Sequence, residues 1–528
     1  MAENHLSIPD LLENIASLSP TRKVFTFPDQ SSMTIAVFYN RVELLSEFLL
    51  RNGIKKGMCV AILDDQFTNL PIIYFALAKI GVITLPLLPT LKPSELEFVL
   101  KQNKVVAIFA PPAKKEMLTN IESSHLKYFI NISSFKFESL HPDSATQKIE
   151  KEIHKIKKAA TELIKPDELS SPPEVNVDDE LQRLILPKND NEWKTYRYTH
   201  RHLIAATDLL TDNLNLNSNV KLFFLLPFYF NLTISLGVLA PVFKNYQVVF
   251  SKQPQNLTEL KLLLKKENPT HVLAEVSFFE KLLESELEIE PDLPFWQRSK
   301  KFLDRLRKKI FNDSYKLIGQ SHWLICTNFQ PLSPVMRNFL LKQKINHTLL
   351  LGTYETTSVL LQGMAQNGGC WLKGNPIKGL EVKLEKDATG WGRLLVKGPN
   401  VLEEETETDW LTLPLIAKQT PEGLCLAGFE NTLIELPENI KIDARLIEAT
   451  LRLLPEVEEV LLLQQNKELV LKVLPNPDAF LTKPFNQLEL INKISKYLDS
   501  QFPFSIEIAR VQIEKHPFPK TPLGQILR

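Results

Sequence analysis

Glycine is scarce in this chain, with 17 glycines among 528 residues, well under half of the roughly 7% that is usual. Backbone that wraps closely around a phosphate group needs glycine, because a Cβ atom blocks the close approach of successive amides. The scarcity therefore argues against a phosphate-binding loop before any motif is considered.

An excess of charge of one sign is also lacking, because Lys+Arg and Asp+Glu both number 62. A nucleic-acid partner would require a basic field, so we expect none. The four cysteines, Cys59, Cys326, Cys370 and Cys425, show no CxxC or CxH spacing. We expect no zinc site, and buried or free thiols in a reducing cytosol.

Long uncharged runs are nearly absent, and the N-terminus lacks the basic start and apolar core of a signal peptide. One stretch, 222–243, carries no charged side chain and is long enough to span a bilayer. It contains two prolines and several polar residues, and it divides into a strand-like and a helix-like part. A buried strand and helix of an α/β core is therefore the favoured interpretation.

What the chain does contain is a regular alternation of helical and strand patterns in its first part. We predict helices over 9–18, 36–52, 70–80 and 93–102, and strands over 24–27, 59–63, 82–88 and 105–110. This rhythm is typical of an α/β fold with parallel sheets covered by helices. It resumes with a helix over 199–210, a helix over 257–267 and strands near 222–226, 248–250 and 271–273.

Two ranges interrupt the pattern and are predicted to be insertions. Residues from about 140 to 190 contain a Lys/Glu-rich run followed by a stretch of prolines and acids, which indicates a surface loop. Residues 295–311 carry seven Lys/Arg and one acid around one apolar helical face. That helix is expected either to pack on its own domain or to make a peripheral contact with an anionic membrane.

The last part of the chain indicates a small α+β domain. Short strand patterns begin near residue 380, and beyond residue 431 helices are predicted over 444–453 and 487–498, with strands over 457–464, 469–474 and 508–513. We therefore predict an N-terminal domain over 1–430 and a C-terminal domain over 431–528.

Several stretches, in order along nearly the whole chain, resemble the adenylate-forming superfamily of acyl-CoA synthetases, acyl-carrier-protein ligases, luciferases and adenylation domains. They are NGIKKGMCVAIL at 52–63, ALAKIGVITLPLLPTLKPSELEFVL at 76–100, YTHRHL at 198–203, PLSP at 331–334, LLGTYETTS at 350–358, GRLLVKGPNVL at 392–402 and PKTPLGQILR at 519–528. The resemblance implies a large α/β N-terminal domain with a β subdomain, a small C-terminal domain, and ATP-dependent formation of an acyl-adenylate. The basic 295–311 range and the GRLLVKGPNV phrase look most like long-chain fatty acyl ligases.

The family's phosphate loop is a Ser/Thr/Gly-rich run that should end just before Thr199. Here the sequence is LPKNDNEWKTYRYTH, in which Lys194 falls on the family's lysine. No glycine is present, and Asp190 and Glu192 occupy positions near the expected polyphosphate. Each carboxylate would disfavour phosphate binding by about 1 kcal/mol or more at an effective dielectric constant near 20.

The adenine and metal side keeps more of the pattern. Gly352, Thr353 and Glu355 fall on the nucleotide segment, and Glu355 matches the family's magnesium-linked glutamate; a surface glutamate at a strand end is the alternative. Leu351 stands where the family has an aromatic residue. Asn328 and Phe329 replace a Gly-Gly pair before PLSP.

The remaining nucleotide contacts of the family are altered. Leu415 occupies the ribose aspartate position, and leucine cannot accept hydroxyl hydrogen bonds. Phe429 and Glu430 follow Gly428 where the family has an arginine, and Gln525 replaces the C-terminal lysine. Losing that charge typically costs about 100- to 1000-fold or more in rate. No other catalytic set is recognised, and His200 and His347 are expected to be structural.

Three hypotheses follow from this pattern. The first is a pseudoenzyme that binds an acyl chain, an acyl carrier protein or a homologous ligase. The second is an active fatty acyl ligase that uses ATP and Mg through non-standard residues, which the retained Lys194 and Glu355 favour. The third is a new activity in the old cleft. We expect a cytoplasmic protein, with membrane association only through 295–311.

Overall fold

The computed structural model describes residues 6–27, 31–63, 69–140, 172–187, 192–251, 254, 257–278, 320–327, 330–342, 344–364, 370–403, 409–481, 485–521 and 525–528. The predicted basic helix at 295–311 and the Lys/Glu-rich run of the first insertion lie outside these residues.

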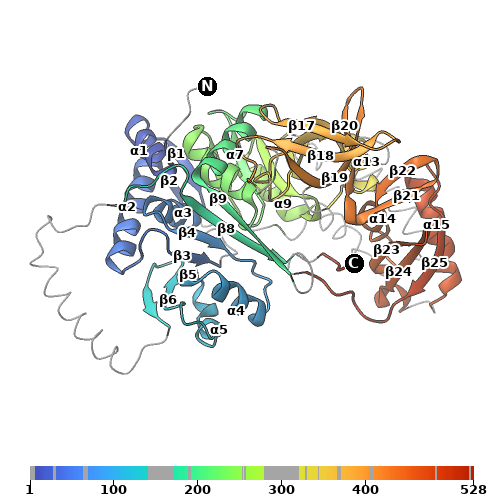
Figure 1. Ribbon diagram of the computed structural model, residues 1–528, viewed down its shortest axis with the longest axis horizontal. Coiled ribbons are helices and arrows are strands. Elements are labelled where there is room, and N and C mark those ends of the chain that lie inside the picture. The colour runs from blue at the N-terminus through green and yellow to red at the C-terminus, as the bar shows by residue number, and fades with distance from the viewer. Residues whose placement is uncertain are drawn as a thin grey trace, which may run out of the picture. The chain divides into compact units, whose positions relative to one another are not determined.

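Figure 1 labels the helices and strands along the chain. The chain divides into two compact units. Unit 1 comprises Met1–Ile204 and Pro227–Asn245, and unit 2 comprises Ala205–Leu226 and Tyr246–Arg528. Residues 431–528 lie within unit 2, where they form sheets of their own. The division at residue 430 remains a prediction.

Unit 1 is built on a seven-stranded sheet in the order β7-β6-β5-β3-β4-β8-β9. Neighbouring strands from β6 to β8 are parallel, and β7 and β9 pair antiparallel at the two edges. The strands are β3 (Cys59–Ile62), β4 (Ile83–Pro86), β5 (Val105–Ala110), β6 (Tyr128–Asn131), β7 (Phe137–Ser139), β8 (Glu180–Pro187) and β9 (Trp193–Thr199).

Helices and a small hairpin complete unit 1. Apolar residues of α4 and α5 pack with strand residues in one core, as the helical spacing predicts. The elements are α1 (Ile8–Leu18), the hairpin β1 (Lys23–Thr26) and β2 (Ser32–Thr34), α2 (Ile35–Arg51), α3 (Leu70–Lys79), α4 (Pro93–Gln102), the 3₁₀ turn η1 (Pro112–Lys114) and α5 (Lys115–Thr119). Helix α2 ends before Gly53, whose φ of 83° is the left-handed conformation expected after a helix end.

Strand β8 corrects part of the predicted insertion. The range 140–190 was expected to be a surface loop, yet Glu180–Pro187 forms a strand next to β4. Leu181, Leu184 and Ile185 are buried in it. The prolines and acids of the preceding stretch obscured a strand that belongs to the sheet.

The uncharged stretch 222–243 has the predicted strand-and-helix form. Strand β10 (Lys221–Phe224) is followed by the π-helix η3 (Thr233–Leu239) and by α8 (Ala240–Phe243). Among the described residues, no helix has both the length and the apolar character needed to cross a bilayer.

Unit 2 contains a long mixed sheet in the order β17-β18-β19-β20-β16-β15-β14-β13-β12-β10-β11. Its strands from β14 to β11 are parallel, and the others pair antiparallel. The further strands are β11 (Gln247–Phe250), β12 (His271–Glu275), β13 (His322–Cys326), β14 (His347–Leu351), β15 (Leu361–Met364), β16 (Leu372–Pro376), β17 (Glu381–Lys386), β18 (Trp391–Lys397), β19 (Leu411–Thr420) and β20 (Gly423–Phe429).

One hydrophobic core joins the parallel and antiparallel parts of this sheet. Leucines and a methionine from α9 (Leu257–Glu267) and α13 (Pro334–Lys342) pack with buried residues of both parts. Helix α7 (His200–Asn213) begins in unit 1 and continues into unit 2. The α/β fold with parallel sheets is therefore confirmed.

The C-terminal part of unit 2 has its own sheet and core. Strands β23, β24 and β25 form one sheet, packed with α14 and α15, and β21 and β22 form a separate pair. The bounds are η4 (Glu430–Thr432), β21 (Leu433–Leu436), η5 (Pro437–Asn439), β22 (Ile440–Asp443), α14 (Ala444–Leu451), β23 (Val457–Gln465), β24 (Glu468–Pro475), η6 (Pro477–Phe480), α15 (Gln487–Gln501) and β25 (Ile508–Ile513).

A disulfide overturns part of the cysteine prediction. Cys370, just before β16, and Cys425, on the paired strand β20, are joined with their Cα atoms 5.5 Å apart. The expectation of four thiols is wrong for this pair, while Cys59 and Cys326 are free and buried. Disulfides are typical of oxidising compartments, so the cytoplasmic prediction loses the support it drew from the cysteines.

The disulfide should be detectable chemically. Denatured protein without reductant should show two reactive thiols and, after reduction, four, because only Cys59 and Cys326 are free. Reduction of the folded protein should lower its free energy of unfolding by roughly 2–4 kcal/mol, since the bond closes a long loop. A Cys370→Ser/Cys425→Ser protein should be insensitive to reductant; four thiols before reduction would refute the pairing.

Candidate functional site

The nucleotide segment of the sequence analysis forms a tight loop after β14. An ideal Cβ atom at Gly352 would lie 2.0 Å from the Ser358 carbonyl carbon, so only glycine fits there. The Thr353 amide donates to Thr356 Oγ1 at 2.9 Å, and the Ser358 amide donates to the Thr353 carbonyl at 2.8 Å. These bonds close residues 352–358 on themselves, and we call this segment the 352–358 loop.

Asn400 fastens the loop to the neighbouring chain. Its side chain is fully buried and donates to the carbonyls of Thr356 and Val359, at 2.7 and 3.1 Å. Thr357 Oγ1 donates to the Asn400 carbonyl at 2.6 Å. The GRLLVKGPNV phrase of the sequence thus supplies the asparagine that fixes the loop, a role that sequence reasoning did not assign.

Glu355 lies in the middle of this loop. Its carbonyl accepts a hydrogen bond from the Leu402 amide at 2.8 Å, and its residue is half-buried. The structure therefore brings together Gly352, Thr353 and Glu355 in one ordered segment at the carboxyl end of a parallel strand. Ligands of α/β sheets commonly bind at such ends.

Lys194 lies on a strand, at the second residue of β9. It is opposite Leu186 in the β8–β9 hairpin, and its Nζ is 5.1 Å from the centroid of the Tyr196 ring, within cation–π range. The preceding Trp193 packs against Phe98 with ring centroids 5.6 Å apart. Lys194 belongs to unit 1 and Glu355 to unit 2. Asp190, like Asn328 and Phe329, lies outside the described residues.

Leu415, at the expected ribose position, is a core residue. It is fully buried on β19, opposite Phe429 of β20, within the main core of unit 2. A carboxylate at position 415 would lie among leucines from neighbouring strands, whereas the apolar side chain of Leu415 suits these surroundings.

Asp443 organises the chain that follows Phe429. The carboxylate is completely buried and accepts from the Phe429 amide at 3.2 Å, from Thr432 Oγ1 at 2.6 Å and from the Arg445 amide at 2.9 Å. A Cβ atom at Gly428 would lie 2.3 Å from Asp443 Oδ2, so the carboxylate occupies the space that this glycine leaves.

Arg445 completes this cluster. Its Nη2 donates to Asp443 Oδ2 at 2.6 Å, and its guanidinium carbon lies 4.5 Å from the Trp371 ring centroid and 5.0 Å from that of Phe429. Phe429 and Trp371 also contact each other, with centroids 5.4 Å apart. Phe429, at the family's arginine position, therefore takes part in packing an arginine that comes from elsewhere in the chain.

The C-terminal segment that carries Gln525 folds back on itself. The Thr521 amide donates to the Gln525 carbonyl at 2.8 Å, and the Leu527 amide donates to the Pro519 carbonyl at 2.9 Å. Lys520, the neighbouring lysine of the motif, forms an ion pair with Glu459 of β23. Both the turn and its lysine are thus held by local contacts.

The last residue anchors this segment. Arg528 Nη2 donates to both carboxylate oxygens of Glu448 at 2.7 Å, and Nη1 donates to the Leu462 carbonyl at 2.9 Å. Glu448 lies on α14 and is buried, and this burial raises its pKa against the opposing effect of Arg528. The arginine keeps a buried carboxylate paired.

The two histidines named above occupy buried positions. His200 Nδ1 accepts from the Ile8 amide at 3.3 Å, and burial lowers the pKa of His200 to about 4. His347 Nδ1 lies 2.7 Å from the Ile345 carbonyl oxygen. These contacts with backbone groups agree with the structural role expected for both.

Sequence reasoning missed the Asp443–Arg445 cluster and the Glu448–Arg528 pair. One local signal was available: Asp443 directly precedes a helical apolar run, a typical N-cap position, and its side chain does cap α14 through the Arg445 amide. The Arg528 contact joins residues 80 positions apart, and nothing local in the sequence indicates it.

Comparison with known proteins gives consistent results. A family model for AMP-binding enzymes matches residues 12–178 and 194–404. The medium-chain fatty-acid–CoA ligase of Escherichia coli (strain K12) is 27% identical over 110 residues, which are 21% of this chain and 19% of that protein. The matched segment thus spans about a fifth of the length of this curated relative.

Similar folds are found over nearly the whole chain. The anthranilate CoA ligase AuaEII in complex with anthranoyl-AMP has a TM-score of 0.72 at 15% identity, covering 99% of this chain and 96% of its own. The o-succinylbenzoate coenzyme A synthetase MenE of Bacillus subtilis in complex with AMP has a TM-score of 0.71 at 16% identity, with 98% and 97% covered. At these identities the similarity establishes the fold.

The Asp443 cluster should be a main determinant of the stability of unit 2. Asp443→Asn keeps the shape of the side chain but points an amide donor at groups that themselves donate. The free energy of unfolding, measured in urea, should therefore fall by about 3 kcal/mol. Asp478→Asn, at an exposed acid of the same unit, serves as the control and should change stability by less than about 0.5 kcal/mol. Equal stability of the two variants would contradict this role.

The Arg528–Glu448 pair makes a second prediction. Arg528→Met leaves the Glu448 carboxylate buried and unpaired, which should cost about 3 kcal/mol. A Glu448→Gln/Arg528→Met protein no longer has the buried Glu448 charge, so it should recover part of the stability lost in Arg528→Met. The control is Arg510→Met at an exposed site on β25. If the losses of stability in Arg528→Met and in Glu448→Gln simply added up in the double variant, the pairing would be ruled out.

Proposed function

Because this chain belongs to the AMP-binding enzyme family, we propose that it is a pseudoenzyme that keeps the ligase fold without forming acyl-adenylates. Its role is then to bind an acyl chain, an acyl carrier protein or a homologous ligase. The observation that carries this proposal is the position of Leu415, fully buried in the core where the family resemblance places the ribose-binding aspartate.

The stretch expected to form the phosphate loop also supports the pseudoenzyme proposal. The family model's match stops at residue 178 and resumes at residue 194, so the stretch expected to hold the phosphates lies outside it. That stretch contains no glycine. Side chains with Cβ atoms cannot readily follow the backbone path that points successive amides at a phosphate.

The loss of positive charge at positions 429 and 525 also supports the pseudoenzyme proposal. Gln525 offers an amide where the resemblance implies an ammonium on the α-phosphate, and Lys520 is already paired with Glu459. Phe429 replaces the family's arginine and packs beside Arg445, whose guanidinium is committed to Asp443. The positive charges that would stabilise a five-coordinate phosphorus are absent from these positions.

Magnesium ATP therefore fits the described residues poorly. Leu415 and Phe429 have no polar group and Gln525 has no charge, so the ribose acceptor and the cations that the nucleotide needs are missing at these positions. Glu355 and the 352–358 loop are the features that would suit a metal or an adenine.

An active fatty acyl ligase remains the second candidate, favoured by the retained Lys194 and Glu355. Contact with an anionic membrane through the basic 295–311 range is a further proposal, and it concerns residues outside the described part of the chain. Neither candidate requires a nucleic-acid partner.

Binding and turnover measurements should separate these functions. A ligand at about 100 times its dissociation constant stabilises a protein by ~2.7 kcal/mol, so thermal unfolding is a sensitive readout. We expect no shift with ATP and Mg, a shift with a long-chain fatty acid or an acyl carrier protein, and no pyrophosphate release with either.

The decisive variant is Gln525→Lys, which restores the C-terminal ammonium alone. Pyrophosphate release should stay at background in this protein, because the ribose and phosphate positions are still unsuited to ATP. The E. coli medium-chain ligase, assayed alongside, serves as the positive control. Acyl-AMP formation by the unmodified chain at an ordinary rate would refute the proposal.

A further inference from the structure

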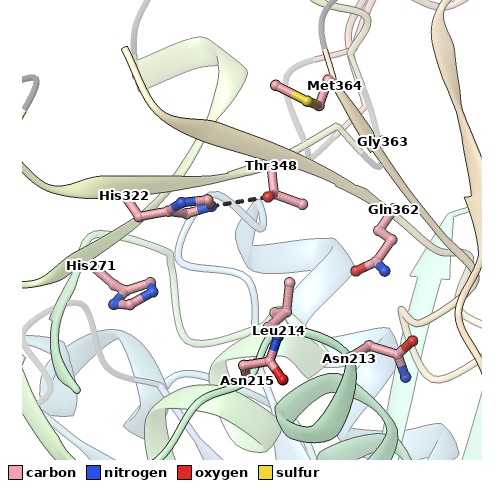
Figure 2. A pocket seen from close by; sticks show the side chains of 9 residues that line it. All are labelled: Asn213, Leu214, Asn215, His271, His322, Thr348, Gln362, Gly363 and Met364. Carbon is pink, nitrogen blue, oxygen red and sulfur yellow. Dashed lines mark hydrogen bonds between the residues drawn. The ribbon is translucent and has the colours of Figure 1, made fainter. Parts of the chain in front are cut away.

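A hollow of about 450 Å³ lies at the amino-terminal edge of the parallel strands in unit 2 (Figure 2). We call it the amino-edge pocket, and its lining comprises Asn213, Leu214, Asn215, His271, His322, Thr348, Gln362, Gly363 and Met364. Its volume falls within the usual range for small-molecule sites, roughly 300–1,000 Å³.

Strand registers explain why these side chains meet. His271 and His322 are the first residues of β12 and β13 and are direct partners in the parallel pairing. Thr348 lies near the start of β14. Strand β15 runs antiparallel to β14, so its last residues, Gly363 and Met364, run back toward this edge, while Gln362 pairs with Leu350. The residues that end α7 and follow it close the hollow from the other side.

This pocket is distinct from the 352–358 loop. The loop follows the carboxyl end of β14, whereas Thr348 lies near its amino end, roughly 13 Å of strand away. None of residues 352–358, which resemble the family's nucleotide segment, lines the pocket. The amino-edge pocket does not depend on the proposed function.

The polar groups of the pocket fall into two sets. His322 Nε2 is hydrogen-bonded to Thr348 Oγ1 at 2.9 Å, and the Asn213 side chain bonds to the backbone of Lys378 and Leu209. By contrast, among the described residues no partner is found for the side-chain amides of Asn215, which is exposed, and Gln362, which is partly exposed. His271 uses Nδ1 with Thr270, at 3.0 Å, which leaves Nε2 available.

No lining side chain carries a charge at neutral pH. Burial lowers the pKa of His271 to about 4, and burial also lowers that of His322, so both imidazoles are neutral. Their rings lie 5.4 Å apart with a tilt of 38° and provide flat faces, and Met364 adds a polarizable thioether. A charged ligand would find no counter-ion in this lining.

The free groups indicate what would bind. A carboxamide presents a donor and an acceptor side by side, which matches a planar molecule carrying an N–H group next to a carbonyl or a ring nitrogen. Figure 2 shows His271 and Gln362 on opposite sides of the hollow, with Asn215 below them in this view. We propose that the amino-edge pocket binds an uncharged nitrogen heterocycle or cyclic amide, held by Gln362, Asn215 and His271.

Uracil and nicotinamide are suitable probes, since both are uncharged and planar and neither is the adenine of the family's nucleotide. Saturation-transfer NMR and calorimetry on the full chain should detect binding of at least one of them. Gln362→Leu and His271→Phe keep size and shape while removing the hydrogen-bonding groups, so each should weaken binding at least 10-fold.

Matched controls separate this site from others. His125→Phe changes an exposed histidine of unit 1, and Glu355→Gln changes the 352–358 loop; both should leave binding unchanged. The proposal is overturned if neither probe binds, if inorganic phosphate binds more tightly than either, or if Glu355→Gln abolishes binding while Gln362→Leu does not. Binding of ATP would count against the proposed function and would leave the amino-edge pocket unaffected.

Discussion

A buried carboxylate determines how the last hundred residues attach to the rest of unit 2. Asp443 has no exposed surface, and an ionised carboxylate in that position is tolerated only if its oxygens are satisfied. Donors from Phe429, Thr432 and Arg445 satisfy it, and Gly428 leaves the space it needs. Because each donor comes from a different point along 428–445, these points cannot separate without leaving a charge unpaired.

The same cluster explains residues that the family comparison alone would describe as losses. An arginine at position 429 would place a second guanidinium beside Arg445, which lies against both the Trp371 and the Phe429 ring. The aromatic residue is the one that stabilises this neighbour. Leu415, opposite Phe429 in the sheet, is likewise suited to its surroundings in the core. Leu415 and Phe429 are therefore compatible with each other and with the residues packed around them.

The sequence predicted most elements whose signals are local. Helices α4 and α9 and strands β5 and β25 have the predicted bounds, since periodicity and flanking turn residues define them. Strand β8 was missed because prolines and acids precede it, and its place depends on pairing with β4, far along the chain. The Cys370–Cys425 bond and the Arg528–Glu448 pair were missed for the same reason. Contacts that depend on distant pairing leave no periodic signal.

The candidate site was predictable only in part, because some of its residues are contiguous in the sequence and others come from separate strands. At the carboxyl edge, the resemblance located Gly352, Thr353 and Glu355 because a short contiguous segment contains them all. In the amino-edge pocket, His271, His322 and Gln362 come from three separate strands, and only the register of β12 to β15 brings them together. The first edge has most of its polar backbone tied into the loop itself, whereas the second keeps side-chain amides without partners among the described residues. Asn215 is exposed and Gln362 is partly exposed, so a molecule bound in the amino-edge pocket would exchange hydrogen bonds with water at these amides.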